Sequence, residues 1–297
     1  MRLEAAVGAA IGGALAVSAT MAFVRNEEEF ARRAGLKGTQ IRPDQHGRNI
    51  EYTLTGPAPT AERPVIICEN GLGSPLESWD WVEHELRADY PVLRYHRRGY
   101  ARTKSLGRPA ELLESLVEEV APSSPIVFLS HSIGALITAN VLDESPAIAA
   151  RTTAAYLIDG TDAELLKIAR ESPPSVGQYR QMTMQEILAS VTGVNRWTVS
   201  KIERDVEYRP DIQRSYLVTS GSVRTLFAAQ REYLHEPLSG QLGHPDQAIQ
   251  MHLFAAADNV TQQQRLAERL GATFNIIEES AHRSIIGKIA CARAVVR

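Results

Sequence analysis

One short stretch of the sequence points most clearly to chemistry, because it places a serine between a strand and a helix. The apolar run Ile126–Leu129 is typical of a buried strand, and Ser130-His131-Ser132-Ile133-Gly134 follows it directly. A helical pattern with small residues comes next. A serine at such a turn sits in a strained backbone conformation with its hydroxyl projecting. The pattern predicts Ser132 as a nucleophile, although a strand–turn–helix with an incidental serine would look the same.

The elements that must position this serine alternate between short apolar runs and helical patterns. A β-hairpin is predicted first, from Thr39–Arg42 and Asn49–Leu54. Apolar runs of the kind that form buried parallel strands follow, with helical patterns between them. The predicted fold class is α/β, with a mostly parallel central sheet and helices on both faces. The runs are Val65–Glu69, Pro91–Tyr95, Ile126–Leu129, Ala154–Ile158, Ile249–Phe254 and Thr273–Ile277, and the helical patterns are Ser78–Ala88, Ala110–Val120, Gly134–Leu142, Thr261–Leu270 and Ser284–Val295.

The alternation breaks once, between residues 160 and 243, where helical segments occur without a convincing strand. We interpret residues 160–243 as a helical cap inserted between the two parts of the α/β core, residues 25–159 and 244–297. The insertion carries several aromatic side chains, and most of them fit ordinary packing. Trp197 is the one that we expect in the wall of a substrate pocket.

From about Thr39 to the C-terminus, the insertion apart, the chain resembles the α/β-hydrolase superfamily, whose members carry a variable cap at the place of the insertion. Asn70-Gly71-Leu72-Gly73 follows a predicted strand and resembles the oxyanion loop of that family, with Asn70 where His is common. Ser130 stands where the family has Gly. The resemblance implies an α/β-hydrolase fold with the nucleophile at Ser132.

A second segment, residues 94–103, resembles the family's Asp-x-Arg-Gly-x-Gly-x-Ser motif. His96 replaces the Asp of that motif, and Ala101 replaces its second Gly. Neither change removes a catalytic residue, but both could alter the mouth of the site. We interpret the arginines of this segment as solvated side chains of a structural turn rather than as a phosphate site.

The resemblance also implies the partners of the serine, which needs a base that is oriented by a carboxylate. The family order along the chain is serine, acid, histidine. His282, in the loop after Thr273–Ile277, matches the family's base, and Asp258, just past Ile249–Phe254, matches its acid. Asp159, after Ala154–Ile158, is the alternative acid, because some family members place the carboxylate there.

These residues imply acyl transfer through an acyl-serine, on an ester, a lactone or a thioester. His282 would take the proton of Ser132, and the carboxylate would fix the imidazole tautomer. The backbone amides of Leu72 and Ile133 would stabilise the oxyanion. A serine nucleophile argues against epoxide hydrolase and haloalkane dehalogenase chemistry, which in this family use an aspartate at that position.

Two other interpretations stay open. A C–C hydrolase, a peptidase or a cofactor-free haloperoxidase would use the same framework. A protein of another class, which keeps the fold but binds a ligand without turnover, is the second alternative. The departures at Asn70, His96 and Ser130 favour it slightly, whereas the complete set of serine, acid and histidine favours the enzyme.

Composition limits the partners of the chain. Its 32 basic and 35 acidic residues give a net charge of −3, which argues against a generic nucleic-acid-binding protein. The two cysteines, Cys68 and Cys291, cannot form a disulfide framework, and no Cys/His cluster has the spacing of zinc ligands. We therefore expect a small-molecule substrate, no metal and no cofactor.

The N-terminal segment is a separate feature. Residues 5–24 carry no charge, over about the length that a helix needs to cross a bilayer. Residues 1–24 are therefore a candidate membrane anchor, with a cleaved signal segment or a helix packed on the domain as alternatives. Positive charges such as Arg25, Arg32 and Arg33 follow the run and would keep the catalytic domain on the cytoplasmic side of a membrane. A cytoplasmic or a secreted protein is the alternative.

Overall fold

The computed structural model describes residues 39–192, 206–238, 240 and 249–297, and short pieces of the N-terminal segment at residues 12–14, 16–18, 20, 21 and 25. Most of residues 5–24 and Trp197 lie outside the described residues, so what the sequence predicts for them stays a prediction. Over the part of the chain that is described, no helix combines the length and the apolar character needed to cross a membrane.

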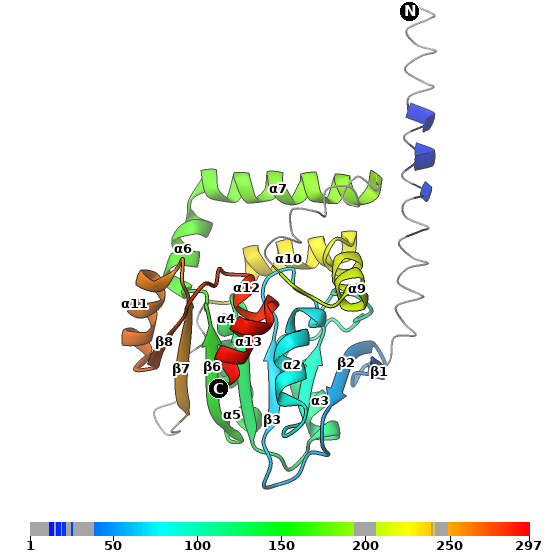
Figure 1. Cartoon of the computed structure of the whole chain (residues 1–297). Coiled ribbons are helices and arrows are strands. Elements are labelled where there is room, and N and C mark those ends of the chain that lie inside the picture. The colour runs from blue at the N-terminus through cyan, green and yellow to red at the C-terminus, as the bar shows by residue number, and fades with distance from the viewer. Residues whose placement is uncertain are drawn as a thin grey trace, which may run out of the picture.

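An eight-stranded sheet forms the centre of the molecule, with its strands in the order β1-β2-β4-β3-β5-β6-β7-β8 (Figure 1). β2 runs antiparallel to β1 and to β4, and every other neighbouring pair is parallel. The strands lie where the apolar runs predict them. They are β1 (Gln40–Pro43), β2 (Asn49–Thr55), β3 (Val65–Glu69), β4 (Val92–Tyr95), β5 (Ile126–His131), β6 (Thr152–Ile158), β7 (Gln250–Ala256) and β8 (Thr273–Ile277).

Helices cover both faces of this sheet, because successive residues of a buried strand point to opposite sides and both sides are apolar. Ile67 packs on the same face as α3 (Pro109–Val120), α4 (Gly134–Glu144) and α5 (Pro146–Ala149), and α11 (Val260–Leu270) packs beside α4. Ile66 packs on the opposite face, which is covered by η1 (Leu76–Trp79), α2 (Asp80–Leu86), α12 (Ser284–Gly287) and α13 (Ile289–Val296). The predicted mostly parallel sheet with helices on both faces is confirmed.

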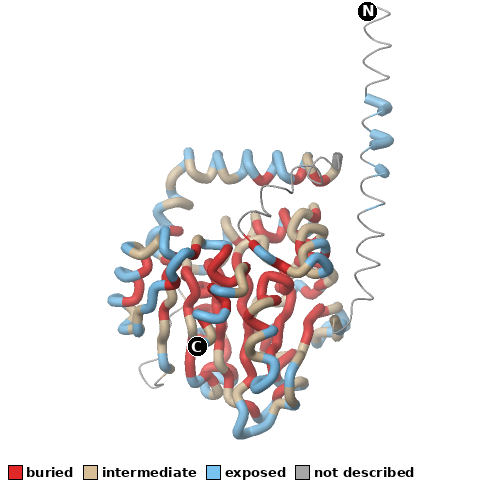
Figure 2. Tube along the Cα trace, in the orientation of Figure 1, coloured by how far each residue is buried: buried red, intermediate tan, exposed pale blue. Residues whose placement is uncertain are grey.

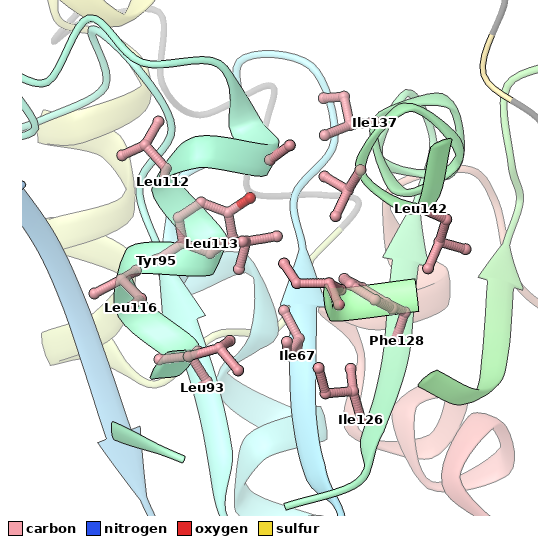
Figure 3. Packing of buried hydrophobic residues seen from close by; sticks show 14 of the residues in the cluster. Ile67, Leu93, Tyr95, Leu112, Leu113, Leu116, Ile126, Phe128, Ile137 and Leu142 are labelled. Carbon is pink, nitrogen blue, oxygen red and sulfur yellow. The ribbon is translucent and has the colours of Figure 1, made fainter. Parts of the chain in front are cut away.

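The strands that carry the site are rigidly packed. Figure 2 shows the buried residues concentrated along the sheet and the exposed ones on the outer sides of the helices. In Figure 3, Ile67, Leu93 and Phe128 of the strands lie against Leu113 of α3 and Ile137 of α4, and all five are fully buried. Residues at the ends of such strands have little freedom to move, which suits a site that must hold reacting groups in place.

Between β6 and β7 the described chain forms helices and no strand. They are α6 (Ala163–Glu171), α7 (Pro173–Thr192), α9 (Pro210–Ser220) and α10 (Val223–His235). α7 packs against α6 and α10, and α9 packs against η1, so this segment lies over the end of the sheet at which the site is found (Figure 1). The assignment of residues 160–243 as a cap stays a prediction.

Candidate active site

Ser132 occupies the turn between β5 and α4. Its backbone φ is +57°, in the left-handed region that residues with a Cβ rarely adopt. The Ser132 N–H donates to Ile158 O (3.1 Å), and Ser132 O accepts from the Thr161 N–H (2.9 Å). Both partners lie at or just beyond the end of β6, so the neighbouring strand holds this strained turn in place.

Small residues on either side of Ser132 let α4 pass close to β3. A Cβ at Gly134 would lie 2.5 Å from the backbone oxygen of Glu69 and 3.0 Å from that of Asn70. Ser130 is fully buried, and its hydroxyl hydrogen-bonds to the hydroxyl of Thr138 (2.7 Å). Serine therefore replaces glycine at this position at little cost, because it is small and its polar group has a partner.

Gly134→Ala is expected to lower the free energy of unfolding by about 2–3 kcal/mol, because the added methyl group meets backbone atoms that cannot move aside. Gly177 in α7 provides the matched control, since a Cβ there would meet nothing within 4 Å. Gly177→Ala is expected to raise the free energy of unfolding by about 0.5–1 kcal/mol, through helix propensity. Urea unfolding measures both. A Gly134→Ala protein as stable as the wild type would contradict the close approach of α4 to β3.

Ser132, His282 and Asp159 form one hydrogen-bonded set. His282 Nε2 lies 3.0 Å from Ser132 Oγ, and His282 Nδ1 makes a short hydrogen bond to Asp159 Oδ2. A carboxylate can only accept, so His282 carries its proton on Nδ1 and its Nε2 can accept the proton of Ser132. This is the arrangement that a serine nucleophile needs.

Asp159 is held as a carboxylate at the end of β6. Burial opposes its ionisation, but hydrogen bonds from His282, from the Asn259 side chain (3.0 Å) and from the Ala256 N–H (3.4 Å) outweigh burial. The pKa of Asp159 therefore lies below its usual value. The carboxylate is 1% exposed and stays charged at neutral pH, where it can stabilise a protonated His282.

The prediction that Asp258 is the carboxylate partner of His282 is wrong, and the alternative, Asp159, makes that contact. Asp258 is exposed and lines an open cleft of about 580 Å³ between α6 and α11. The reason is the strand order: β6 lies beside β5, so its end is adjacent to Ser132, whereas β7 is one strand further away. The end of β7 and the turn after it contribute the Ala256 N–H and the Asn259 side chain as donors to Asp159, instead of an acid.

The two predicted oxyanion donors belong to two segments that meet at Ser132. Ile133 follows the serine at the N-terminus of α4, and Leu72 belongs to the loop after β3. A Cβ at Gly71 would lie 3.4 Å from Ser132 Cβ, which places this loop against the serine. Within the described residues, neither the Leu72 N–H nor the Ile133 N–H has a hydrogen-bond partner, so both can donate to a substrate oxygen.

His131 is a neighbour of the site to which the sequence gives no role. Its ring lies 4.8 Å from the ring of His282 between centroids, and its Nε2–H donates to the backbone oxygen of His282 (2.7 Å). Burial and the nearby His282 lower the pKa of His131 to about 3. His131 is therefore neutral at neutral pH, so it holds the His282 loop without competing for the proton of Ser132.

A cavity of about 350 Å³ opens beside these groups. Leu72, Gly73 and Ser74 of the oxyanion loop line part of it, together with Arg283, next to His282. The remaining lining residues come from the segment between β6 and β7 and are mostly apolar, with Thr183, Glu186 and Ser220 as polar members. They include Tyr179 and Met182 of α7, Tyr216 and Leu217 of α9, and Leu226 and Ala229 of α10.

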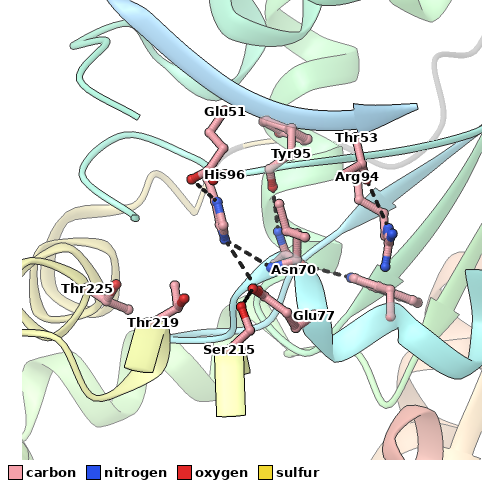
Figure 4. A network of polar contacts seen from close by, with 12 residues as sticks. Glu51, Thr53, Asn70, Glu77, Arg94, Tyr95, His96, Ser215, Thr219 and Thr225 are labelled. Carbon is pink, nitrogen blue, oxygen red and sulfur yellow. Dashed lines mark hydrogen bonds and ion pairs between the residues drawn. The ribbon is translucent and has the colours of Figure 1, made fainter. Parts of the chain in front are cut away.

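The prediction of solvated arginines after β4 is wrong for Arg97, which is 1% exposed and bonded to buried carboxylates. His96 is also buried. Its Nδ1–H donates to Glu51 Oε2 (3.0 Å), as Figure 4 shows. Its Nε2 accepts from the Leu76 N–H (3.1 Å). The segment thus fastens β2, η1 and the oxyanion loop together. The partners lie far apart in the sequence, so the local pattern gives no sign of this role.

Comparison with known proteins identifies the family of the fold. A model described as "Alpha/beta hydrolase family" matches residues 65–287. A curated relative from Gibberella zeae, an "AB hydrolase superfamily protein", is 32% identical over 97 residues. That match covers 30% of this chain and 30% of the relative's length.

Solved structures of the same fold come from proteins that are named for different reactions. The Cif epoxide hydrolase from Acinetobacter nosocomialis superposes with a TM-score of 0.64 at 16% identity, over 92% of each chain. The enol-lactonase from Burkholderia xenovorans gives 0.59 at 15% identity, over 83% of this chain and 94% of its own. A thermophilic esterase from Thermogutta terrifontis gives 0.60 at 14% identity, over 87% and 95%. At these identities the likeness establishes the fold, and the reaction has to be argued from the site.

Proposed function

The chain belongs to the alpha/beta hydrolase family, and we propose that it is a serine hydrolase that cleaves an ester, a lactone or a thioester through an acyl-serine intermediate. One observation carries the proposal: His282 Nε2 lies 3.0 Å from Ser132 Oγ while His282 Nδ1 is bonded to Asp159. A base held in this tautomer activates a serine for attack on a carbonyl carbon.

In the acylation step, Ser132 Oγ forms a bond to the substrate carbonyl carbon and its proton moves to His282 Nε2. Asp159 stabilises the imidazolium that results. The tetrahedral intermediate then collapses, the bond to the leaving group breaks, and His282 returns the proton to the leaving oxygen or sulfur. Water repeats the sequence on the acyl-serine and releases the acid. The side chain of His282 is 48% exposed, so water can reach it.

The oxyanion of each tetrahedral intermediate would be stabilised by the N–H groups of Leu72 and Ile133. Both are fixed by the fold before substrate binds, so no reorganisation is needed during the reaction. The N-terminus of α4, where Ile133 lies, adds a favourable dipole. Loss of one such donor typically lowers turnover by about 10²–10³-fold.

The cavity beside Leu72 is the proposed acyl site, and the helices between β6 and β7 form its cap. Its aliphatic and aromatic walls favour an apolar acyl group over a charged one. Each buried methylene contributes about 0.8 kcal/mol, so a few methylenes give a preference of one to two orders of magnitude in kcat/KM. A volume of about 350 Å³ suits a medium-length chain.

A series of p-nitrophenyl esters from acetyl to dodecanoyl tests the proposal. The wild type is expected to hydrolyse medium-chain esters with a kcat/KM about 10–100 times that for the acetyl ester. Leu217→Ala should lower kcat/KM for the best chain by about 3–10-fold and leave the acetyl ester unchanged, because it removes part of the apolar wall.

Leu165→Ala is the matched control, since Leu165 is an exposed leucine of α6 that lines the other cleft. It should leave the whole profile unchanged. A flat chain-length profile would refute the acyl site. A folded wild type that turns over no ester, lactone or thioester would refute the hydrolase and favour a binding protein.

A further inference from the structure

The loop that carries Leu72 is hydrogen-bonded on both sides of that residue. On one side, Arg97 Nη1 donates to the backbone oxygen of Asn70 (2.7 Å), and Arg97 Nη2 donates to that of Gly71 (3.1 Å). On the other side, the Gly73 N–H donates to the hydroxyl of Tyr100 (3.1 Å). Arg97 and Tyr100 thus form hydrogen bonds with three successive peptide groups around Leu72, and we call this set of contacts the clamp.

The side chain of Asn70 adds a further attachment. Its Nδ2 donates to Tyr95 O (2.8 Å), as Figure 4 shows, and its Oδ1 accepts from Trp79 Nε1–H (2.9 Å). Asn70 is 1% exposed, so these bonds are shielded from water. The asparagine that replaces the usual histidine therefore ties the start of the loop to β4 and η1.

Arg97 uses all five of its N–H groups. Besides the two loop oxygens, Nη1 donates to Glu69 Oε1 (2.7 Å), while Nε and Nη2 donate to the two carboxylate oxygens of Glu232 (2.8 Å each). Tyr100 donates its hydroxyl proton to Glu232 Oε2 (2.6 Å). Arg97 and Tyr100, which both hydrogen-bond to the loop, are therefore bonded to the same carboxylate. That carboxylate belongs to α10, 135 residues further along the chain.

We propose that Arg97 and Glu232 are positioning residues, through which cap helix α10 sets the place of the Leu72 N–H in the oxyanion hole. This inference rests on the proposed function. It makes the cap a part of the catalytic apparatus as well as the wall of a pocket. Oxyanion stabilisation depends on donors that are held at a fixed position. The bidentate and charge-assisted hydrogen bonds of the clamp hold the Leu72 N–H in this way.

A purely structural role explains the arrangement less well. Three charged side chains are buried together here, Arg97 with Glu69 and Glu232, and buried ion networks are often no more stabilising than apolar residues of the same size. The desolvation cost of such a network is explained where its hydrogen bonds hold other groups in a fixed position. The fixed geometry in this case is that of the two carbonyl groups directly before Leu72.

The test uses the full-length protein and one medium-chain p-nitrophenyl ester. Glu232→Gln puts an amide donor where Arg97 or Tyr100 also donates, so the clamp is broken with little change in shape. We expect kcat to fall about tenfold, less than loss of the whole donor would cost, with KM within about twofold of the wild type. A trifluoromethyl ketone, which forms a tetrahedral oxyanion on the serine, should bind about tenfold more weakly.

Tyr100→Phe is a second, milder variant, because it removes only the hydroxyl that joins Glu232 to the Gly73 N–H. It should lower kcat in the same way, by about 3-fold or more. The double variant Tyr100→Phe with Glu232→Gln should lose no more than the worse single variant, because both act through one contact.

Asp80→Asn is the matched control. Asp80 of α2 is buried and forms a bidentate ion pair with Arg209, which precedes α9, so it also joins the core to the insertion. Among the described residues, its side chain has no hydrogen bond to either loop of the site. It should leave kcat within about twofold of the wild type, the ordinary consequence of a change remote from the chemistry. An equal fall of kcat in this control would overturn the proposal in favour of a general role of cap attachment.

Hydrogen–deuterium exchange of the peptide that spans residues 69–76 gives a readout independent of turnover. We expect exchange about tenfold faster in Glu232→Gln than in the wild type or in Asp80→Asn, because the loop opens more often. Unchanged exchange would overturn the clamp even in an active enzyme. Faster exchange in a protein without hydrolase activity would support the clamp and refute only the proposed function.

Discussion

Ser132→Ala is expected to lower kcat for the best ester by about 10⁴–10⁶-fold while the protein stays folded. The variant removes only the hydroxyl that His282 Nε2 contacts at 3.0 Å, so no covalent intermediate can form. The residual rate would come from substrate binding and from the N–H groups of Leu72 and Ile133.

His282→Ala should give a loss of similar size, and the double variant should be no worse than either single one. Residues that act as a unit in one step are not additive. The measurement is kcat and KM for the three variants, with a thermal unfolding curve for each. A Ser132→Ala protein with more than about one tenth of wild-type kcat would exclude Ser132 as the nucleophile.

Asp159→Asn is the second change with a large expected effect, a loss of about 10⁴-fold in kcat. An amide nitrogen at the place of Asp159 Oδ2 would donate to His282 Nδ1, so the proton of the imidazole would move to Nε2. That nitrogen could then no longer accept the proton of Ser132. Since the pKa of Asp159 is below its usual value, the carboxylate should stay charged at neutral and mildly acidic pH, and its protonation should cause no loss of activity there.

Asp258→Asn is the matched control for the acid. Both aspartates follow a strand of the same sheet, but Asp258 is exposed and faces the cleft between α6 and α11. Its replacement should leave kcat within about twofold of the wild type. The reverse result, with loss of activity in Asp258→Asn and not in Asp159→Asn, would restore the sequence-based assignment and refute the geometric one.

The choice between these two aspartates shows where reasoning from the sequence stops. The apolar runs predict each strand, and the turn Ser130–Gly134 predicts the position of the nucleophile. Asp159 and Asp258 look alike in that pattern, because each follows a strand. Strand order separates them, and it depends on packing between segments that are about a hundred residues apart in the chain.

Arg97 marks a second limit of the same kind. In the sequence it stands in a run of arginines before a glycine, which is typical of a solvated turn. Its burial depends on Glu69, at the end of another strand, and on Glu232, in a helix far along the chain. The extent of the cap at residues 160–243 and the role of Trp197 remain predictions.

Ser132 is expected to form a covalent adduct with an electrophilic substrate. A fluorophosphonate forms a bond between its phosphorus and the serine oxygen, releases fluoride, and gives an adduct that mass spectrometry can locate. The wild type is expected to gain the mass of one phosphonyl group on the peptide that contains Ser132, with no adduct in Ser132→Ala and slow labelling in His282→Ala. A folded wild-type protein that stays unlabelled, or that is labelled at another residue, would contradict a nucleophilic role of Ser132.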